Sequence, residues 1–204
     1  VFSVFFRTSK VFGKQPIKGI DSRLTFCSLL ESFACSELIS ICDNASIVQQ
    51  GFFASRSGCF YRTKRGNAGS FRLAVKLSAL HPSTIVYFVE DDHLHRPLQK
   101  QFICEGLKWF DFVSLYDHPD KYTPRYQGLQ SQIIVSNYCH WRTVPSSCGT
   151  FAGRVKTFKE DLDIHMSSLG DHNKFTLLAE RNRNIISAMP AFATHCVEPW
   201  TSPF

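Results

Sequence analysis

The sequence lacks the patterns that mark membrane-spanning, nucleic-acid-binding and disulfide-rich proteins. No window reaches about 18 uninterrupted apolar residues, so no membrane span is expected. The nearest approach to a basic arm, RTKRG (62–66), is short, so nucleic acid is not an expected partner. The eight cysteines form no CxxC pair and lie mostly within apolar runs, which indicates reduced, buried thiols in a cytoplasmic protein.

What the sequence does contain is enough apolar material for one domain with a sizeable core. The chain has 204 residues, of which 44% are hydrophobic and nineteen are phenylalanines. No repeat, low-complexity tract or linker divides it, so residues 1–204 are expected to form a single α/β domain. The net charge of +6 suits an anionic small substrate such as a nucleotide.

Apolar periodicity predicts alternating strands and helices in the first half of the chain. Residues 1–6 and 38–42 are apolar and bounded by polar turns, as buried strands are. Between them, apolar residues recur every three or four positions over 22–38, which indicates a helix capped by Asp21 or Ser22. This order predicts two parallel strands with a right-handed crossover. The next expected elements are a loop over 51–68, a helix over 70–80 and a strand over 84–89.

The second half predicts a more mixed arrangement. The expected order is a helix over 97–109, a strand over 110–117, an antiparallel strand over 131–138, short strands within 139–152, a helix over 152–169 with Gly170 as C-cap, and a helix from an Asp171 cap to about residue 183. From Ile185 onward, three prolines predict an irregular tail. The whole pattern favours a mostly parallel central sheet flanked by helices, with a smaller antiparallel part.

Polar residues follow three of the predicted strands at the point where each strand ends. Arg7 and Thr8 follow the first, Asp43 follows the second, and three consecutive acids (90–92) follow the strand over 84–89. Ligands of open α/β sheets bind outside the carboxyl ends of the parallel strands, so these residues are expected at one edge. Carboxylate oxygens suit Mn²⁺ or Mg²⁺ shared with substrate phosphates. The alternative is a solvated acidic turn.

The order of these motifs resembles that of the GT-A fold glycosyltransferases, in the broad group that includes the family 2 enzymes. VFSVFFRTS (1–9) resembles their first strand and polar turn, and ISICDNAS (39–46) their second strand ending in an Asp that contacts the nucleoside. VYFVEDD (86–92) resembles their apolar strand closing in a DxD-type metal motif. The match covers about residues 1–95. The Gln-x-x-Arg-Trp motif of processive synthases is absent, which implies a non-processive enzyme.

The resemblance implies a division of labour between two halves of the chain. Residues 1–95 would bind a nucleoside-diphosphate sugar, with a UDP-sugar favoured. Asp43 would hydrogen-bond the base or ribose, and Arg7 and Thr8 would line the nucleotide pocket. Residues 96–204 would bind the acceptor, which is expected to be a glycan, a glycoprotein or a lipid-linked molecule.

The same resemblance implies a metal site. Asp92 would ligate Mn²⁺ or Mg²⁺, with Asp91 beside it contacting the sugar or ribose. The motif reads Glu-Asp-Asp rather than Asp-x-Asp, so which acid binds the ion directly, Glu90 included, stays open. In several GT-A enzymes a late histidine completes the metal shell, and His195 is the candidate here. The alternative for His195 is a core histidine with satisfied hydrogen bonds.

GDHNKFTLL (170–178) resembles, more loosely, a family helix that begins with the catalytic base. Asp171 would then deprotonate the acceptor hydroxyl opposite the departing diphosphate, which inverts the anomeric carbon. The alternative for Asp171 is a plain N-cap, a role compatible with catalysis. Competing acids lie on the preceding predicted helix, at Glu160, Asp161 and Asp163.

CHWRTVPSSCGTF (139–151) offers candidates for acceptor or phosphate binding. Trp141 could stack on a sugar ring, and Arg142 could hold a phosphate. The alternative is a core Trp beside a surface Arg. For the whole chain, the leading hypothesis is a metal-dependent hexosyltransferase, and the alternatives are a nucleotidyltransferase or a non-catalytic domain that binds a glycan or a partner.

Overall fold

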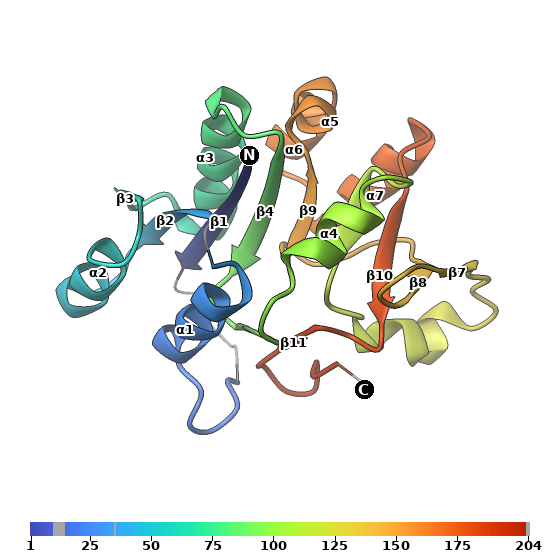
Figure 1. Cartoon of the computed structure of the whole chain (residues 1–204), viewed down its shortest axis with the longest axis horizontal. Helices are drawn as coiled ribbons and strands as arrows, with labels where there is room; N and C mark the ends of the chain where they lie inside the picture. The colour runs from blue at the N-terminus through green and yellow to red at the C-terminus, as the bar shows by residue number, and fades with distance from the viewer. Residues whose placement is uncertain (10–14, 35, 203–204) are drawn as a thin grey trace.

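The computed structural model describes residues 1–9, 15–34 and 36–202, and these contain eleven strands (Figure 1). The strands are β1 (Phe2–Ser9), β2 (Glu37–Asp43), β3 (Cys59–Thr63), β4 (Ile85–Glu90), β5 (His93–His95), β6 (Phe112–Ser114), β7 (Ile133–Val135), β8 (His140–Thr143), β9 (Phe151–Arg154), β10 (Ile185–Met189) and β11 (Ala193–His195). The helices are α1 (Ser22–Ser32), α2 (Ile47–Ala54), α3 (Gly66–Leu80), α4 (Lys100–Gly106), α5 (Val155–Glu160), α6 (Leu162–Met166) and α7 (Asp171–Glu180), with 3₁₀ turns η1 (Pro119–Tyr122) and η2 (Pro124–Tyr126).

Nine of these strands form one sheet in the order β3-β2-β1-β4-β9-β6-β10-β8-β7. Within the described residues, β8 and β9 run opposite to the other seven strands of this sheet. The remaining two, β5 and β11, form a separate antiparallel ribbon. The predicted α/β class, with a mostly parallel sheet and a smaller antiparallel part, is confirmed. No helix in the described ranges is both long and apolar enough to cross a membrane.

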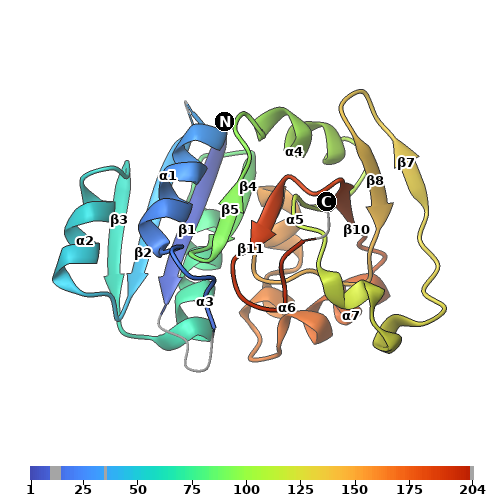
Figure 2. The ribbon, with the colours of Figure 1, turned by 90° about the horizontal axis from the view of Figure 1, so that it is seen from below.

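The sheet is buried on both faces, which explains the continuous apolar runs of its central strands. In β1, Phe2, Val4 and Phe6 belong to a core shared with α1, α2 and α4, whereas Phe5 belongs to a second core shared with α3, α5, α6 and α7. Side chains alternate between the two faces of a strand, so one strand supplies both cores. Figure 2 shows α1 and α4 on one side of the sheet and α3, α6 and α7 on the other.

The parallel register brings polar residues to one edge of the sheet, called here the carboxyl edge. The expected parallel pairing of β1 and β2 is confirmed, and it places Ser9 opposite Asp43. The parallel pairing of β1 with β4 places Arg7 opposite Glu90. The turn that follows β4 therefore opens at the same edge as the end of β2.

Two segments predicted to be irregular are regular. The range 51–68, expected to be a loop, contains the end of α2, all of β3 and the start of α3. The signal for α2 lies just before that range, because Ser46 and Gln49 form a reciprocal capping box. The tail from Ile185 is also not irregular, because β10 is a buried strand in the sheet interior. Its five residues carry too little periodicity to be distinguished from an apolar loop.

The helix predicted over 152–169 is also partly wrong. Its first residues belong to β9, an antiparallel strand inserted between β4 and β6, and the rest divides into α5 and α6. Gly170 is the N-cap of α7 rather than the C-cap of the preceding helix, and Asp171 is the first helical residue rather than the cap. The predicted helix over 22–38 ends earlier, at Ser32, while its Asp21 cap is confirmed by bonds from the amides of Arg23 and Leu24.

Candidate functional site

Arg7 and Glu90 form a buried ion pair where β1 and β4 end. The Arg7 guanidinium also donates to the main-chain carbonyl of Asn67 (2.9 Å) and to Ser70 Oγ (3.2 Å). Arg7 is 5% exposed and lies outside the lining of the two pockets described next. It was expected to line the nucleotide pocket, but its charge is directed to Glu90 behind that pocket.

Two adjoining pockets open at the carboxyl edge and share Ser9 and Asp91. The first, of ≈ 250 Å³, is also lined by Thr25 and Asp92, and the second, of ≈ 350 Å³, by Thr8. These volumes are in the range of small-molecule sites once the two are joined. Thr8, Asp91 and Asp92 therefore line pockets at the carboxyl edge, and their contact with a donor stays a prediction.

Asp43 lines the second pocket and also holds the start of α3. Its Oδ1 accepts from the backbone N–H groups of Arg65 (2.6 Å) and Gly66 (3.2 Å). Its Oδ2 accepts from Ser9 Oγ (3.2 Å) and from the Asn44 side-chain amide (2.9 Å). Asp43 is thus a buried anchor of the pocket wall, and a ligand would share a carboxylate that these four donors already orient.

A compact group of one carboxylate and two imidazoles lies beside the first pocket. Asp92 Oδ1 is 2.9 Å from His93 Nδ1, and Asp92 Oδ2 is 3.0 Å from His195 Nε2. The β5–β11 ribbon creates this group, because its register pairs His93 directly with His195, and their rings stack at 4.8 Å. The ligand atoms of Asp92, His93 and His195 lie within 4.8 Å of one another. Among the described residues, Asp91 does not join this group.

The charges of this group are set by burial and by mutual contact. Burial opposes the charged form of Asp92, but its contacts with His195 and His93 outweigh burial, so the pKa of Asp92 lies well below its usual range. Burial lowers the pKa of His93, although Asp92 acts in the opposite direction. A deprotonated carboxylate beside neutral imidazole is the donor set that a divalent transition metal takes. The residues present therefore fit a metal ion.

Cys148 extends this group through the other nitrogen of His93. Its Sγ lies 3.5 Å from His93 Nε2, which gives the order Cys148–His93–Asp92 of a thiol, a base and an orienting acid. Burial and the nearby Glu90 raise the pKa of the Cys148 thiol well above its ordinary value. The thiolate is therefore disfavoured, and the arrangement does not make Cys148 a nucleophile.

Asp171 lies at the same edge, at the start of α7. Burial raises the pKa of Asp171 to about 6, and the charge of Glu90 adds to the rise, while Lys174 and Arg7 oppose it. Lys174 follows one turn later in α7 and packs against the Phe71 ring at 4.7 Å. A partly buried carboxyl group with a raised pKa can accept a proton near neutral pH.

The competing acids lie elsewhere and have arginine partners. Asp161 accepts from Arg183 Nε at 2.7 Å, Asp163 from Arg181 at 2.6 and 2.8 Å, and Glu160 from Arg183 at 2.7 Å. Arg183 directly precedes Asn184, whose amide bonds Asp111 just before β6 and β10 begin. These acids therefore belong to the opposite, amino edge of the sheet.

Trp141 and Arg142 are corrections to the sequence analysis. Trp141 is 0% exposed and its indole N–H donates to Ser136 Oγ (3.1 Å), so its ring is part of the core and no sugar can reach it. Arg142 is also buried, and its guanidinium donates twice to Asp117 Oδ1 at 2.6 and 3.0 Å. Arg142 therefore pairs with Asp117 and holds the segment that carries η1 in place.

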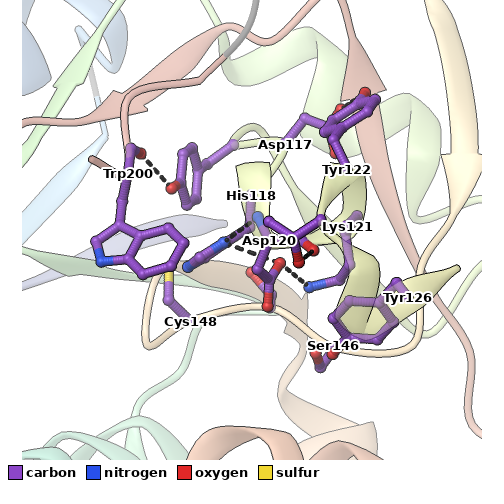
Figure 3. A network of polar contacts seen from close by, with 12 residues as sticks. Asp117, His118, Asp120, Lys121, Tyr122, Tyr126, Ser146, Cys148 and Trp200 are labelled. Atoms are coloured by element: carbon purple, nitrogen blue, oxygen red, sulfur yellow. Dashed lines mark hydrogen bonds and ion pairs between the residues drawn. The ribbon is translucent and has the colours of Figure 1, made fainter. Parts of the chain in front are cut away.

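That segment forms a polar network that the sequence analysis did not identify (Figure 3). His118 Nδ1 lies 2.9 Å from Asp120 Oδ1, and the same oxygen accepts from Lys121 Nζ at 2.7 Å. The His118 ring lies 5.2 Å from that of Trp200, near the end of the described chain. Burial lowers the pKa of His118 to about 4.

Two of the residues missed by the sequence analysis had a readable signal, and the others had none. His93 directly follows the acids, and HLH places two histidines on one face of a strand. Asp120 follows Pro119 in a turn-rich stretch. The proximity of Cys148 to His93 spans 55 positions and has no local signature.

Comparison with known proteins supports the fold. No protein-family model matches the sequence, and no curated protein matches it. Among solved structures, the chain is similar to a nucleotidyl transferase from Methanothermobacter thermautotroptrophicus, with a TM-score of 0.59 at 10% identity, covering 92% of this chain and 87% of that one. It is similar to CMP:2-keto-3-deoxy-manno-octonic acid synthetase complexed with CTP, with a TM-score of 0.55 at 13% identity, covering 92% and 88%.

A third similar structure is TarS from S. aureus, with a TM-score of 0.59 at 16% identity. The match covers 97% of this chain but 37% of TarS. All three identities are too low to transfer an activity. The likenesses place this chain, as to its fold, among α/β proteins that include nucleotidyltransferases.

Proposed function

We propose that the protein is a metal-assisted glycosyltransferase that moves a sugar from a nucleoside-diphosphate sugar, UDP-sugar favoured, to an acceptor hydroxyl. The observation that carries the proposal is that a set of metal-binding side chains and a carboxyl group with a raised pKa lie at the same edge of the sheet. The group of Asp92, His93 and His195 lies beside the first pocket, and Asp171, whose pKa is raised to about 6 by burial, lies at the same carboxyl edge. The reaction is expected to be inverting and non-processive.

Asp92, His93 and His195 would hold the metal ion. Mg²⁺ prefers an all-oxygen shell, whereas Mn²⁺ accepts imidazole, so the two histidines favour Mn²⁺. Such an ion, when bound, would neutralise the charge that develops on the departing diphosphate. Thr8, Asp43 and the turn at Asp91 would contact the nucleoside, as pocket lining.

Asp171 would take the proton of the acceptor hydroxyl. With a pKa of about 6, its carboxylate is mostly ionised at pH 7 and is a stronger base than an ordinary aspartate. Lys174 and Arg7 favour its ionised form. A base on the acceptor side, opposite the diphosphate, gives attack from the far face of the sugar and hence inversion.

The test is calorimetry with UDP and a panel of nucleotide sugars, with and without Mn²⁺. We expect Mn²⁺-dependent binding to the wild-type protein and at least about a hundredfold weaker binding to Asp92→Asn, because the carboxylate is the central member of the group. Asp163→Asn, which removes an exposed carboxylate at the other edge, is the matched control and should bind as the wild type does. No binding of any nucleotide sugar with Mn²⁺ would refute the proposal.

Nucleotidyl transfer is the second candidate, because one of the similar structures is a nucleotidyl transferase and another is a synthetase complexed with CTP. The two reactions differ in what leaves. A nucleotidyltransferase releases pyrophosphate from a nucleoside triphosphate and a sugar phosphate, and a glycosyltransferase releases a nucleoside diphosphate. Incubation with CTP or UTP plus sugar 1-phosphates, followed by a pyrophosphate assay, separates them.

A further inference from the structure

A further concave site lies on the outer side of α3. This α3 groove has a volume of ≈ 330 Å³ and is lined by Arg65, Gly69, Arg72, Leu73, Lys76 and Met166. Arg72 and Lys76 lie seven and eleven positions after Arg65, so the three cations share one face of the helix. Among the residues that the structure describes, no carboxylate lines the groove.

The three cations of the groove are not neutralised by the protein. Within the part of the chain that the structure describes, none of their side chains forms an ion pair or a hydrogen bond, whereas Arg142, Arg181 and Arg183 all pair with acids. Arg72 and Lys76, four positions apart on one helix, repel each other and destabilise α3 slightly. A like-charge arrangement that costs stability and lines a concavity is more typical of anion binding than of a solvated face.

Gly69 leaves room for the side chain of one of these cations, Arg65. A Cβ atom added at Gly69 would lie 2.5 Å from Cβ of Arg65, so the Arg65 side chain occupies the space that any other residue would fill. Glycine within a helix is destabilising relative to alanine. The helix therefore carries a destabilising residue at a position where a larger one would displace the start of the Arg65 side chain.

The Arg65 end of the α3 groove adjoins the second pocket of the carboxyl edge. The backbone N–H of Arg65 donates to Asp43, which lines the second pocket. At the other contact, the charge of Arg72 helps to lower the pKa of Lys174, after the larger effect of burial. Lys174 lies one turn after Asp171 in α7. The groove therefore adjoins the second pocket through Arg65, and its Arg72 is close enough to Lys174 to influence the charge of that side chain.

We infer that the α3 groove binds anionic groups of the acceptor, so that the acceptor is a linear glycan or sugar chain carrying phosphate or carboxylate groups. That the bound molecule is the acceptor rests on the proposed function. That the groove binds anions rests on its shape and its three cations alone. A concave groove fits a linear chain better than a flat lipid surface. Its lining has no aromatic ring on which nucleic-acid bases could stack.

The probe is fluorescent dextran sulfate, with neutral dextran of the same length as the uncharged counterpart. The groove variant is Arg65→Gln/Arg72→Gln/Lys76→Gln, and the matched control is Lys108→Gln/Lys156→Gln/Lys159→Gln, which removes the same charge from exposed sites elsewhere. We expect dextran sulfate, but not dextran, to bind the wild-type protein, at least tenfold weaker binding to the groove variant, and less than a twofold change in the control. Circular dichroism checks that each variant is folded. If the triple variant unfolds, the single variant Arg72→Gln replaces it, and we expect this variant to bind dextran sulfate about threefold more weakly than the wild type.

Equal loss in the groove and control variants would overturn the inference, because binding would then follow net charge alone. It would also be overturned if a single-stranded oligonucleotide of matched charge, or vesicles of phosphatidylglycerol, bound the groove in place of dextran sulfate. UDP with Mn²⁺ is titrated into the wild-type protein in parallel. If dextran sulfate binds and UDP does not, the proposed function is refuted and the anion site is retained. If UDP binds and dextran sulfate does not, the anion site is refuted and the proposed function is retained.

Discussion

The molecule has two clusters of carboxylates at opposite edges of one sheet, and they differ in their partners. At the amino edge, Asp161 and Asp163 pair with Arg183 and Arg181 at 2.6 to 2.8 Å. At the carboxyl edge, Asp92 faces His93 and His195 instead. Asp171, at the same edge, has a pKa raised to about 6.

The arginine–carboxylate pairs of the amino edge are permanent contacts, whereas the contacts of Asp92 with its two histidines can be exchanged for a ligand. Arginine keeps its charge at every physiological pH and matches a carboxylate with a planar fork, so the amino-edge pairs fix the positions of α5, α6 and α7. Histidine can lose its proton and turn a lone pair toward a metal ion. We therefore expect Asp92 and its two histidines to be able to exchange a contact for a ligand, and the amino-edge arginine pairs to stay in place. The following predictions test this contrast.

The largest expected effect is the loss of transfer in Asp171→Asn. An amide cannot accept the acceptor proton, so kcat/KM should fall by roughly a thousandfold, within the usual contribution of a general base. The wild-type rate should rise with pH through about 6, where Asp171 ionises. Product formation is followed by chromatography across pH 5 to 8, and a rate in Asp171→Asn within tenfold of wild type would assign the base to another group.

Asp161→Asn should cause the largest loss of stability. Its side chain is 2% exposed and its two arginines lose their buried partner, so the free energy of unfolding should drop by about 3 kcal/mol. Urea denaturation at pH 7 measures this loss. UDP binding at the other edge should be unchanged, and a binding defect in a folded Asp161→Asn protein would contradict the separation of the two edges.

Asp171→Asn should instead stabilise the protein at pH 8. The pKa of Asp171 is about 6 in the folded protein and near 4 in the unfolded chain, so ionisation above pH 6 costs the folded state free energy. The asparagine avoids that cost, and at about 1.4 kcal/mol per pKa unit, reduced for partial exposure, we expect a gain of about 2 kcal/mol. The gain should vanish at pH 4, and urea denaturation at the two pH values checks this; equal gains at both would point to packing instead of charge.

The smallest effect is expected for Asp163→Asn. This carboxylate is exposed, and although its contact with Arg181 lowers its pKa to about 2, water screens such a pair. The melting temperature at pH 7 should stay within error of the wild type. A clear fall would show that the Arg181 pair matters as much as the buried Asp161 pair.

The parts of the fold that the sequence predicted well have strong local patterns. The apolar run before the acids at 90–92 predicts β4, and Asp21 before a period of three and four predicts the start of α1. The short and inserted elements were predicted less well because they lack such a local pattern. The three to five residues of β9, β10 and β11 are decided by the neighbours they pair with, which lie far away in the chain.

The same division runs through the candidate site. The sequence alone determined that Asp43 and the acids 90–92 lie where parallel strands end, because a strand's side chains and its polar end are local properties, whereas Arg7, expected just after the first strand, lies within β1. Only the tertiary structure decided that His93 pairs with His195 across the β5–β11 ribbon, that Arg142 forms an ion pair with Asp117, and that the Trp141 side chain is buried in the core. The physical reason is that partner choice depends on burial and distance between residues up to about a hundred positions apart, which no local pattern records.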